Sequence, residues 1–179
     1  MSTTTITTGK IRLSYAHLFE ATSMNENDAK KFSTAILIPK KDKKTVKAIE
    51  DAIAAAKEDG KSKKFGGKIP ANLRTPLRDG DDEKPEDENY KGMYFLNCSS
   101  VKRPKVVDED RNEILDAEEV YSGCFGRVNI NFYPYNFENM SKGIAVGLNA
   151  FQKLEDGEHL GGGGVDVDAA FGDDLEDEL

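Results

Sequence analysis

The stretch that decides the fold is Cys124-Phe-Gly-Arg-Val-Asn-Ile-Asn-Phe-Tyr133, within the longer segment YSGCFGRVNINFYPYNF at 121–137. Its side chains alternate with period two, which predicts a strand with one buried face. The row expected in the core comprises Cys124, Val128, Ile130 and Phe132. The opposite row comprises Phe125, Arg127, Asn129, Asn131 and Tyr133. A one-residue slip would exchange the two rows, so the alternation alone does not fix which of them lies inside.

The second row has the composition of a surface that meets nucleic acid. Aromatic faces stack on bases, a guanidinium contacts phosphate or stacks, and amides bond base edges or sugars. A strand face that meets only water would more usually carry Lys, Glu and Thr. The alternative is a sandwich strand whose second face is also covered by protein.

Charge is segregated along the chain of 179 residues, so the net charge of −8 is misleading. All 25 basic residues precede residue 154, whereas ten of the 33 acidic residues follow it. The body therefore carries a charge of about +2 and the tail −10, while a second acidic cluster occupies 79–88. Gly161–Gly164 reads as a flexible spacer within the tail.

Other function classes find little support. The sequence contains no run of 18 apolar residues and no signal peptide, and two cysteines indicate no disulfide framework, which favours a reducing cytoplasm. His17 and His159 lack the spacing of a zinc site, and no P-loop, GxSxG or HExxH motif is present, so we expect no metal, no cofactor and no enzyme. Residues 108–119 match much of an EF-hand loop, but Glu113 stands where a sharp turn needs Gly. An acidic hairpin loop is therefore preferred to a calcium site.

The remaining pattern predicts a mainly β domain. Strands are expected at 9–19, 31–39, 92–99, 101–107 and 143–154, and a helix at 43–59 is closed by Gly60. In the first strand, Ile11, Leu13 and Tyr15 share one face, and Lys10, Arg12 and Ser14 share the other. The last strand repeats the amide, aromatic and cation row as Asn149, Phe151 and Lys153. Residues 1–9 are expected to fray, 61–91 to form a long surface excursion with a basic first half, and 136–142 to form a turn.

The chain resembles the bacteriophage-type single-stranded DNA-binding proteins that carry an OB-fold. The blocks that carry the resemblance are RLSYAHLFEA (12–21), PLRDGD (76–81), RPKVVD (103–108), VYSGCFGRVNINFYPYN (120–136) and KGIAVGLNAFQKL (142–154). The resemblance implies a five-stranded Greek-key barrel over residues 1–154, with one helix after the second strand and long surface loops. A flexible, disordered acidic tail over 155–179 would follow. It also implies a protein that coats single strands without sequence preference in phage DNA replication, recombination and repair, in the cytoplasm of the infected bacterium.

Residues are assigned to this role by their place in the matching blocks and rows. The candidate DNA contacts are Lys10, Arg12, Arg103, Phe125, Arg127, Asn129, Asn131, Tyr133, Phe151 and Lys153. The tail is expected to recruit replication proteins such as a DNA polymerase or helicase and to compete with DNA. Its candidate docking residues are Phe171, Asp173, Asp174, Leu175, Glu176, Asp177, Glu178 and Leu179. Tails of this family often end in an aromatic residue, whereas the last residue here is Leu179.

Two further readings remain open at this point. A β-barrel module for protein interaction or virion assembly would place aliphatic residues on the second face, where Arg127, Asn129 and Asn131 stand. A metal-dependent nuclease would need acids clustered on strands, but here they lie in loops. The sequence fixes neither the oligomeric state nor the size of a binding site.

Overall fold

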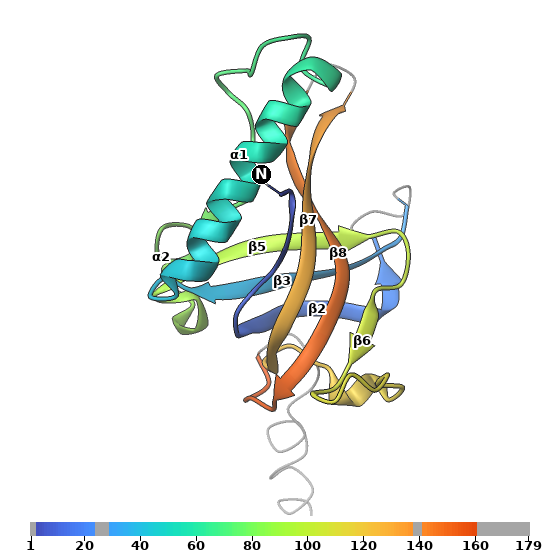
Figure 1. Cartoon of the computed structure of the whole chain (residues 1–179). Coiled ribbons are helices and arrows are strands. Elements are labelled where there is room, and N and C mark those ends of the chain that lie inside the picture. Colours follow the sequence, from blue (N-terminus) through green and yellow to red (C-terminus); the bar gives the residue numbers. More distant parts are fainter. Residues whose placement is uncertain (1–2, 24–28, 138–140, 161–179) are drawn as a thin grey trace, which may run out of the picture.

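The computed structural model describes residues 3–23, 29–137 and 141–160. It is mainly β, with one long helix (Figure 1). The strands are β1 (Thr5–Thr7), β2 (Ile11–Thr22), β3 (Lys31–Pro39), β4 (Arg78–Asp79), β5 (Met93–Ser100), β6 (Lys105–Val107), β7 (Phe125–Phe137) and β8 (Ser141–Glu155). The helices are α1 (Lys43–Lys63), the short α2 (Gly80–Glu83) and the 3-10 turns η1 (Glu88–Tyr90) and η2 (Ala117–Glu119).

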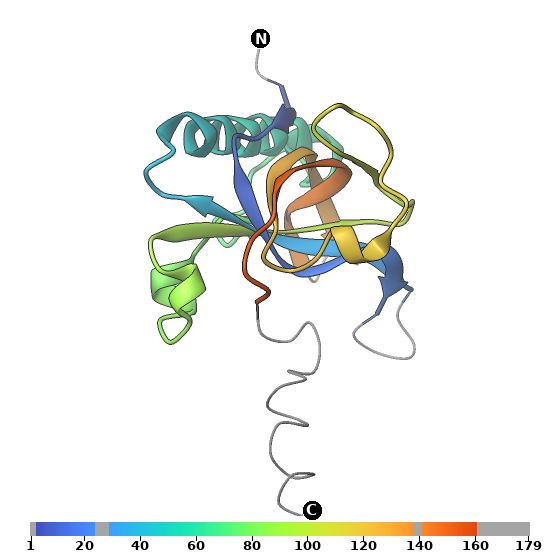
Figure 2. The ribbon, with the colours of Figure 1, turned by 90° about the horizontal axis from the view of Figure 1, so that it is seen from below.

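Five strands close into a barrel. β2 pairs with β3, β3 with β5, β5 with β8, β8 with β7, and β7 again with β2. The junction between β5 and β8 is parallel, and the other four junctions are antiparallel. Figure 2 shows the ring from below, with α1 along one side. The expected OB-fold, with its helix after the second barrel strand, is confirmed.

The barrel core confirms the predicted inner row of β7. Cys124, Val128, Ile130 and Phe132 are all buried. Helix α1 adds Val46, Ile49, Ala52, Ile53 and Ala56 to the same cluster. Asp42 caps the helix by accepting a hydrogen bond from the Thr45 amide, at 3.2 Å.

The helix runs one turn further than its sequence pattern predicts. Gly60 does not end it but lies inside it, buried between Phe65 and Pro134 of β7. A Cβ on Gly60 would stand 2.6 Å from atoms of both neighbours, so the glycine permits close packing rather than a turn. The signal resembled a C-cap because both uses of glycine require the absence of a side chain.

The β7–β8 hairpin is also longer than expected. Strand β7 continues through Tyr135 to Phe137, and Phe137 pairs with Ser141, so the expected turn at 136–142 is mostly strand. The two strands extend beyond the barrel toward the C-terminal end of α1 (Figure 1). Residues 5–7, expected to fray, form β1 against β7.

A β-bulge in β8 overturns one site assignment. Asn129 pairs with Ala150 and Ile130 with Leu148, so Asn149 has no partner of its own in this ladder. The extra residue reverses the alternation, and Phe151 turns inward to an exposure of 0%. Its expected place on the outer row is therefore wrong, and its ring cannot reach a base.

The acidic loop after β6 uses its carboxylates for local structure. The Asp108 carboxylate accepts hydrogen bonds from the amides of Asp110 and Asn112, each at 2.9 Å, and Asp116 caps η2. Among the described residues, no group of three or more His, Cys, Asp or Glu side chains is placed to hold a metal ion. No helix in the described ranges is long and apolar enough to cross a membrane.

Candidate nucleic-acid interface

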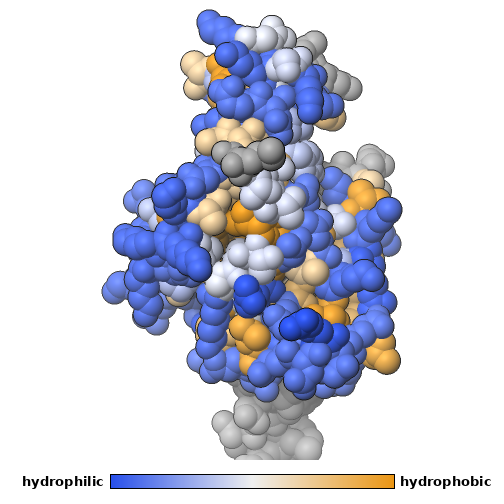
Figure 3. Space-filling view, viewed as in Figure 1, coloured by the Kyte–Doolittle hydropathy of each residue, from blue (hydrophilic) through white to orange (hydrophobic). Residues whose placement is uncertain are grey.

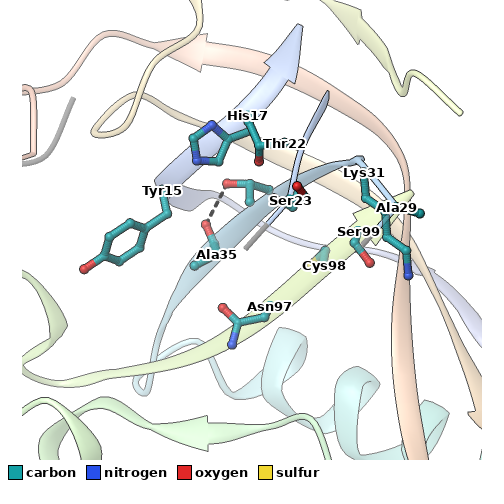
Figure 4. Close-up of a pocket in the computed structure, with 12 residues that line it drawn as sticks. Tyr15, His17, Thr22, Ser23, Ala29, Lys31, Ala35, Asn97, Cys98 and Ser99 are labelled. Atoms are coloured by element: carbon teal, nitrogen blue, oxygen red, sulfur yellow. Dashed lines mark hydrogen bonds between the residues drawn. The ribbon is translucent and has the colours of Figure 1, made fainter. Parts of the chain in front are cut away.

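A large hollow lies on the outer face of β2, β3 and β5. It has a volume of about 990 Å³ (Figure 4). Its floor and walls include Tyr15, His17, Lys31, Ala35, Asn97 and Ser99. We call it the barrel groove. In an OB-fold, this is the sheet face that binds oligonucleotides.

Tyr15 lines the barrel groove, although the alternation had placed it on one face with Ile11 and Leu13, which are buried. Its backbone adopts a φ angle of 49°, and the register of the β2–β3 pairing shifts between Ser14 and His17. Leu13 and Ser14 are both buried as a result, and Tyr15 is 56% exposed. The Lys84 ammonium lies 5.5 Å from the centre of its ring. Strict alternation gave no sign of this bulge, so sequence reasoning missed Tyr15.

A second hollow of about 240 Å³ continues from the first, and we call it the upper pocket. It shares Asn97 and Ser99 with the barrel groove and adds Arg74, Arg78 and Tyr135. The segment that carries Arg74 is held on β8 by two backbone bonds. The Arg74 amide donates to the Lys142 carbonyl at 3.1 Å, and the Ile144 amide donates to the Arg74 carbonyl at 2.9 Å. Because the two hollows share Asn97 and Ser99 in their lining, they form one path across the sheet.

Two residues of the predicted β7 row lie beside this path. Tyr133 is 40% exposed and pairs with Ala145, which lines the upper pocket. The Asn131 amide lies over Gly147, the residue of β8 that pairs with Ser99. A Cβ on Gly147 would collide with that amide, so the glycine makes room for Asn131.

Arg127 and Asn129 point outward as expected but are bound to the N-terminal strand. Arg127 Nε donates to the Thr8 carbonyl at 3.0 Å, and Asn129 Nδ2 donates to Thr7 Oγ1 at 2.9 Å. Asn149 completes the chain by donating to Asn129 Oδ1 at 2.9 Å. The sequence gave no sign of these contacts, because residues 1–9 have no strand pattern of their own.

Four further candidates surround the first residues of the tail. Lys10 pairs with Glu155, and Lys153 Nζ lies 2.6 Å from Asp156 Oδ1. The hydrogen bonds from Lys153 and then from Tyr121 hold the pKa of Asp156 below its usual value. These cations therefore already have carboxylate partners.

Arg12 and Phe125 complete this contact. Arg12 donates to the Gly123 carbonyl at 3.0 Å and to the Glu158 carbonyl at 2.8 Å. Lys10 and Arg12 each lie 5.1 Å from the centre of the Phe125 ring. A Cβ on Gly157 would stand 2.7 Å from that ring, so the tail backbone covers it closely.

Residues 155–160 are therefore part of the folded body, which corrects the boundary placed at 154. Tyr121 stacks on His159 with ring centres 3.9 Å apart, and its hydroxyl donates to the Gly157 carbonyl at 2.9 Å. The Leu160 amide donates to the Ser122 carbonyl at 3.0 Å. We call this assembly the tail anchor: Lys10, Arg12, Tyr121, Phe125, Lys153 and segment 155–160.

The tail anchor borders the barrel groove. Leu160 is buried in a small cluster with Leu37, Tyr90 and Phe95. Leu37 and Phe95 are paired neighbours on β3 and β5, and Ala35 and Asn97, two residues along each strand, line the groove. The described chain ends on this sheet face (Figure 2). The tail residues beyond 160, including Phe171 and 173–179, lie outside the described residues.

Arg103 lies apart from the two hollows and from the tail anchor. It is exposed between β5 and β6, and its guanidinium lies 4.9 Å from the centre of the Phe19 ring on β2. It lines neither hollow.

Comparison with known proteins identifies relatives of this chain. The family described as Enterobacter phage Enc34, ssDNA-binding protein, matches residues 4–179. Protein p50 of Acyrthosiphon pisum secondary endosymbiont phage 1 is 32% identical, covering 94% of this chain and 95% of that protein. The single-stranded DNA-binding protein of bacteriophage Enc34, solved in complex with ssDNA, superposes with a TM-score of 0.78 at 27% identity. The match covers 88% of this chain and 90% of that chain.

A more distant structure shares the fold alone. Gp2.5, a single-stranded DNA-binding protein encoded by bacteriophage T7, gives a TM-score of 0.57 at 17% identity, covering 90% of this chain and 97% of that one. The profile match over nearly the whole chain, together with the p50 relative, assigns the family: the chain belongs to the single-stranded DNA-binding protein family of Enterobacter phage Enc34.

Proposed function

We propose that this protein binds single-stranded DNA without sequence preference, along the path formed by the barrel groove and the upper pocket. The observation that carries the proposal is the continuity of the two hollows, which share Asn97 and Ser99. Exposed Tyr15 and Tyr133 flank this path, and Lys31, Arg74 and Arg78 lie along it. Aromatic platforms and cations in one groove are the means by which proteins hold single strands of any sequence.

Stacking has to supply much of the affinity. The body carries a charge of only about +2, so attraction to phosphate is modest. Each base stacked on an aromatic ring is worth about 1–3 kcal/mol. The relatives that bind ssDNA by description support the same class of ligand. The action we propose is the coating and protection of strands exposed during phage replication, recombination and repair in the cytoplasm of the infected bacterium.

The acidic tail is proposed to compete with DNA for this path. Residues 155–179 carry ten acids and no base, and the tail anchor starts them on the sheet face that floors the barrel groove. A tethered chain has an effective concentration of about millimolar, sufficient to oppose weak ligands and to yield to a long strand. Once displaced, the tail would be free to recruit a replication protein such as a polymerase or helicase.

A fluorescence titration tests the binding function. Labelled oligo-dT and a duplex of equal length are titrated at two salt concentrations, and we expect tighter binding of oligo-dT. The Tyr15→Ala and Tyr133→Ala variants should each weaken it by about 1–3 kcal/mol. Leu115→Ala, which removes an exposed apolar side chain that lines neither hollow, should not change it. Equal or tighter binding of duplex would reject the proposal and favour a barrel that serves protein interactions.

A further inference from the structure

The backbone of Tyr15 is strained within the barrel groove. Its φ angle of 49° lies in the left-handed region, which residues with a side chain rarely adopt because the Cβ crowds the backbone. Such a conformation costs conformational energy and persists only where the surrounding structure holds it in place. Here it turns the Tyr15 ring outward, and in Figure 4 this ring points away from the side chains of His17 and Thr22. The contacts that hold the turn therefore decide where the ring stands.

A buried tyrosine holds the residue before this turn. The Tyr90 hydroxyl donates to Ser14 Oγ at 2.9 Å, and both residues are buried. Burial raises the pKa of Tyr90, so its hydroxyl keeps the proton that this bond needs. Because a buried hydroxyl without a partner is costly, the bond fixes Ser14 against Tyr90. The other hydrogen bonds at this turn run from Thr34 Oγ1 to the Ser14 carbonyl, at 3.2 Å, and from the Ala16 amide to Ser122 Oγ, at 2.9 Å.

The same part of the chain contacts the ring of Tyr15. The Lys84 ammonium lies 5.5 Å from the centre of the Tyr15 ring and 5.5 Å from the centre of the Tyr90 ring. A cation over an aromatic face is attracted to it electrostatically. Within the described ranges, Lys84 forms no ion pair, so no carboxylate draws its ammonium away from the two rings. The segment from Lys84 to Tyr90 therefore holds Tyr15 twice, at the preceding residue and at the ring.

Carboxylates of the acidic cluster fix the segment that leads to Tyr90. Lys40 Nζ lies 2.6 Å from a carboxylate oxygen of Asp79 and 2.8 Å from one of Asp81. Asp81 also accepts a hydrogen bond from the Gly92 amide at 3.1 Å, and Asp79 caps α2. The outer surface here is hydrophilic, at the left of the space-filling view, where Figure 1 shows α2 (Figure 3). Much of the acidic cluster thus builds the support on which Tyr90 stands.

We propose that Tyr90 is a positioning residue for single-strand binding. It is 1% exposed and does not touch the strand; it holds the turn of β2 that presents Tyr15 to a base in the barrel groove. The inference rests on the proposed function and deepens it, because it names what holds the Tyr15 ring in place before DNA arrives. A ring that is already held loses little conformational freedom when a base stacks on it, so the positioning adds to affinity.

Tyr90 also packs in a cluster of apolar residues, and its two roles can be separated at the hydroxyl. Its ring meets the Phe95 ring edge to face, with the centres 5.2 Å apart, and shares a cluster with Leu37 and Leu160. Tyr90→Phe keeps this packing and removes only the bond to Ser14. A loss of DNA affinity in a normally folded Tyr90→Phe variant therefore reports positioning rather than packing.

The test is a double-mutant cycle between Tyr90 and Tyr15, measured by fluorescence anisotropy with labelled oligo-dT. Tyr15→Ala should weaken binding about five- to 150-fold, corresponding to one lost stacking contact. Tyr90→Phe should weaken it about two- to tenfold, as expected if the presented conformation of Tyr15 falls to between about a half and a tenth of the population. In the Tyr15→Ala background, Tyr90→Phe should hardly change the dissociation constant, because no ring is left to position.

A second variant and a matched control support the cycle. Ser14→Ala removes the acceptor of the same bond and should reproduce the loss, and the combination with Tyr90→Phe should lose no more than either change alone. Tyr94→Phe removes a hydroxyl that forms no hydrogen bond within the described residues, and Tyr94 lines neither hollow. It should bind like the parent. Urea denaturation of each variant measures whether the fold is kept.

Two outcomes would overturn the inference. One is parent-like binding by folded Tyr90→Phe and Ser14→Ala variants while Tyr15→Ala binds weakly. The other is an equal loss from Tyr90→Phe in the parent and in the Tyr15→Ala background. Parent-like binding by Tyr15→Ala would remove Tyr15 from the path, and the inference with it. Failure of every oligonucleotide to bind the parent would instead reject the proposed function.

Discussion

The tail anchor and the upper pocket carry the same kinds of side chain, but their cations differ in the partners that they have within the protein. In the tail anchor, Lys10 and Arg12 lie beside the Phe125 ring and Lys153 lies beside the Tyr121 ring. Each of these cations has a partner in segment 155–160. In the upper pocket, Arg74 lies with Tyr135, and no ion pair within the described residues engages Arg74 or the lysines of 61–68. The difference shows that residue type identifies a candidate contact, whereas its partners decide whether it is free to bind.

The largest expected effect separates a buried ring from an exposed one. Phe151→Ala should lower the free energy of unfolding by about 3–5 kcal/mol, because it leaves a cavity in a packed core. Tyr133→Ala should change it by only about 0.5 kcal/mol, as is usual for a surface substitution. Urea denaturation followed by circular dichroism measures both. Similar values for the two variants would contradict the bulge at Asn149 that turns Phe151 inward.

Binding measurements should distinguish Tyr135 of the upper pocket from Phe125 of the tail anchor. Tyr135→Ala is expected to weaken binding of long oligo-dT by about 1–3 kcal/mol through lost stacking. Phe125→Ala should not weaken it, because tail residues already cover that ring. Anisotropy titrations of the two folded variants make the comparison. A loss for Phe125→Ala as large as that for Tyr135→Ala would show that DNA displaces the tail anchor and uses its ring.

Truncation tests whether the anchor matters for competition. Removing 161–179 should tighten binding of oligo-dT at low salt and hardly at all at high salt, because screening weakens the competition of an acidic tail. Removing 155–179 should add a smaller gain, by freeing Lys10, Arg12 and Lys153 from their partners. Dissociation constants of the three proteins across a salt series decide this. Three superimposable curves would exclude competition by the tail.

The smallest effect is the pH dependence of the anchor. Hydrogen bonds from Lys153 and Tyr121 depress the pKa of Asp156 in the folded protein. Its stabilising contribution should therefore be complete above the ordinary carboxyl pKa and disappear as the pH falls through the lowered value. The stability difference between the parent and Asp156→Asn, measured by urea denaturation from neutral to acidic pH, should shrink in that window. A difference that grows toward acidic pH would contradict the pairing.

Much of the barrel could be predicted from sequence because period-two patterns are local. The inner row of β7 was predicted correctly, and the strand at 31–39 was predicted with its correct bounds. Tyr15 and Phe151 were assigned to the wrong faces because each follows a bulge, and one inserted residue reverses the alternation without changing the composition. In the EF-hand-like loop at 108–119, the Asp108 carboxylate accepts hydrogen bonds from local backbone amides, a contact that the sequence pattern does not reveal.

The sequence predicted only part of the proposed binding path. Tyr133 and Asn131 lie beside the path, but the predicted row ended at Tyr133 and so left out Tyr135 of the upper pocket. Phe137 fell in the turn expected at 136–142, where the structure has strand. The partners of Arg12 and Arg127 come from residues more than 100 positions away in the chain. No pattern of a single strand reveals such contacts.

The most direct test is a crosslinking map of the bound strand. Oligo-dT substituted with 5-iododeoxyuridine is irradiated in complex with the full chain, and the linked peptides are identified by mass spectrometry. We predict crosslinks at Tyr15, Tyr133 and Tyr135, which lie along the proposed path. Crosslinks concentrated at Tyr121 and Phe125, with none along the barrel groove, would contradict the proposed path.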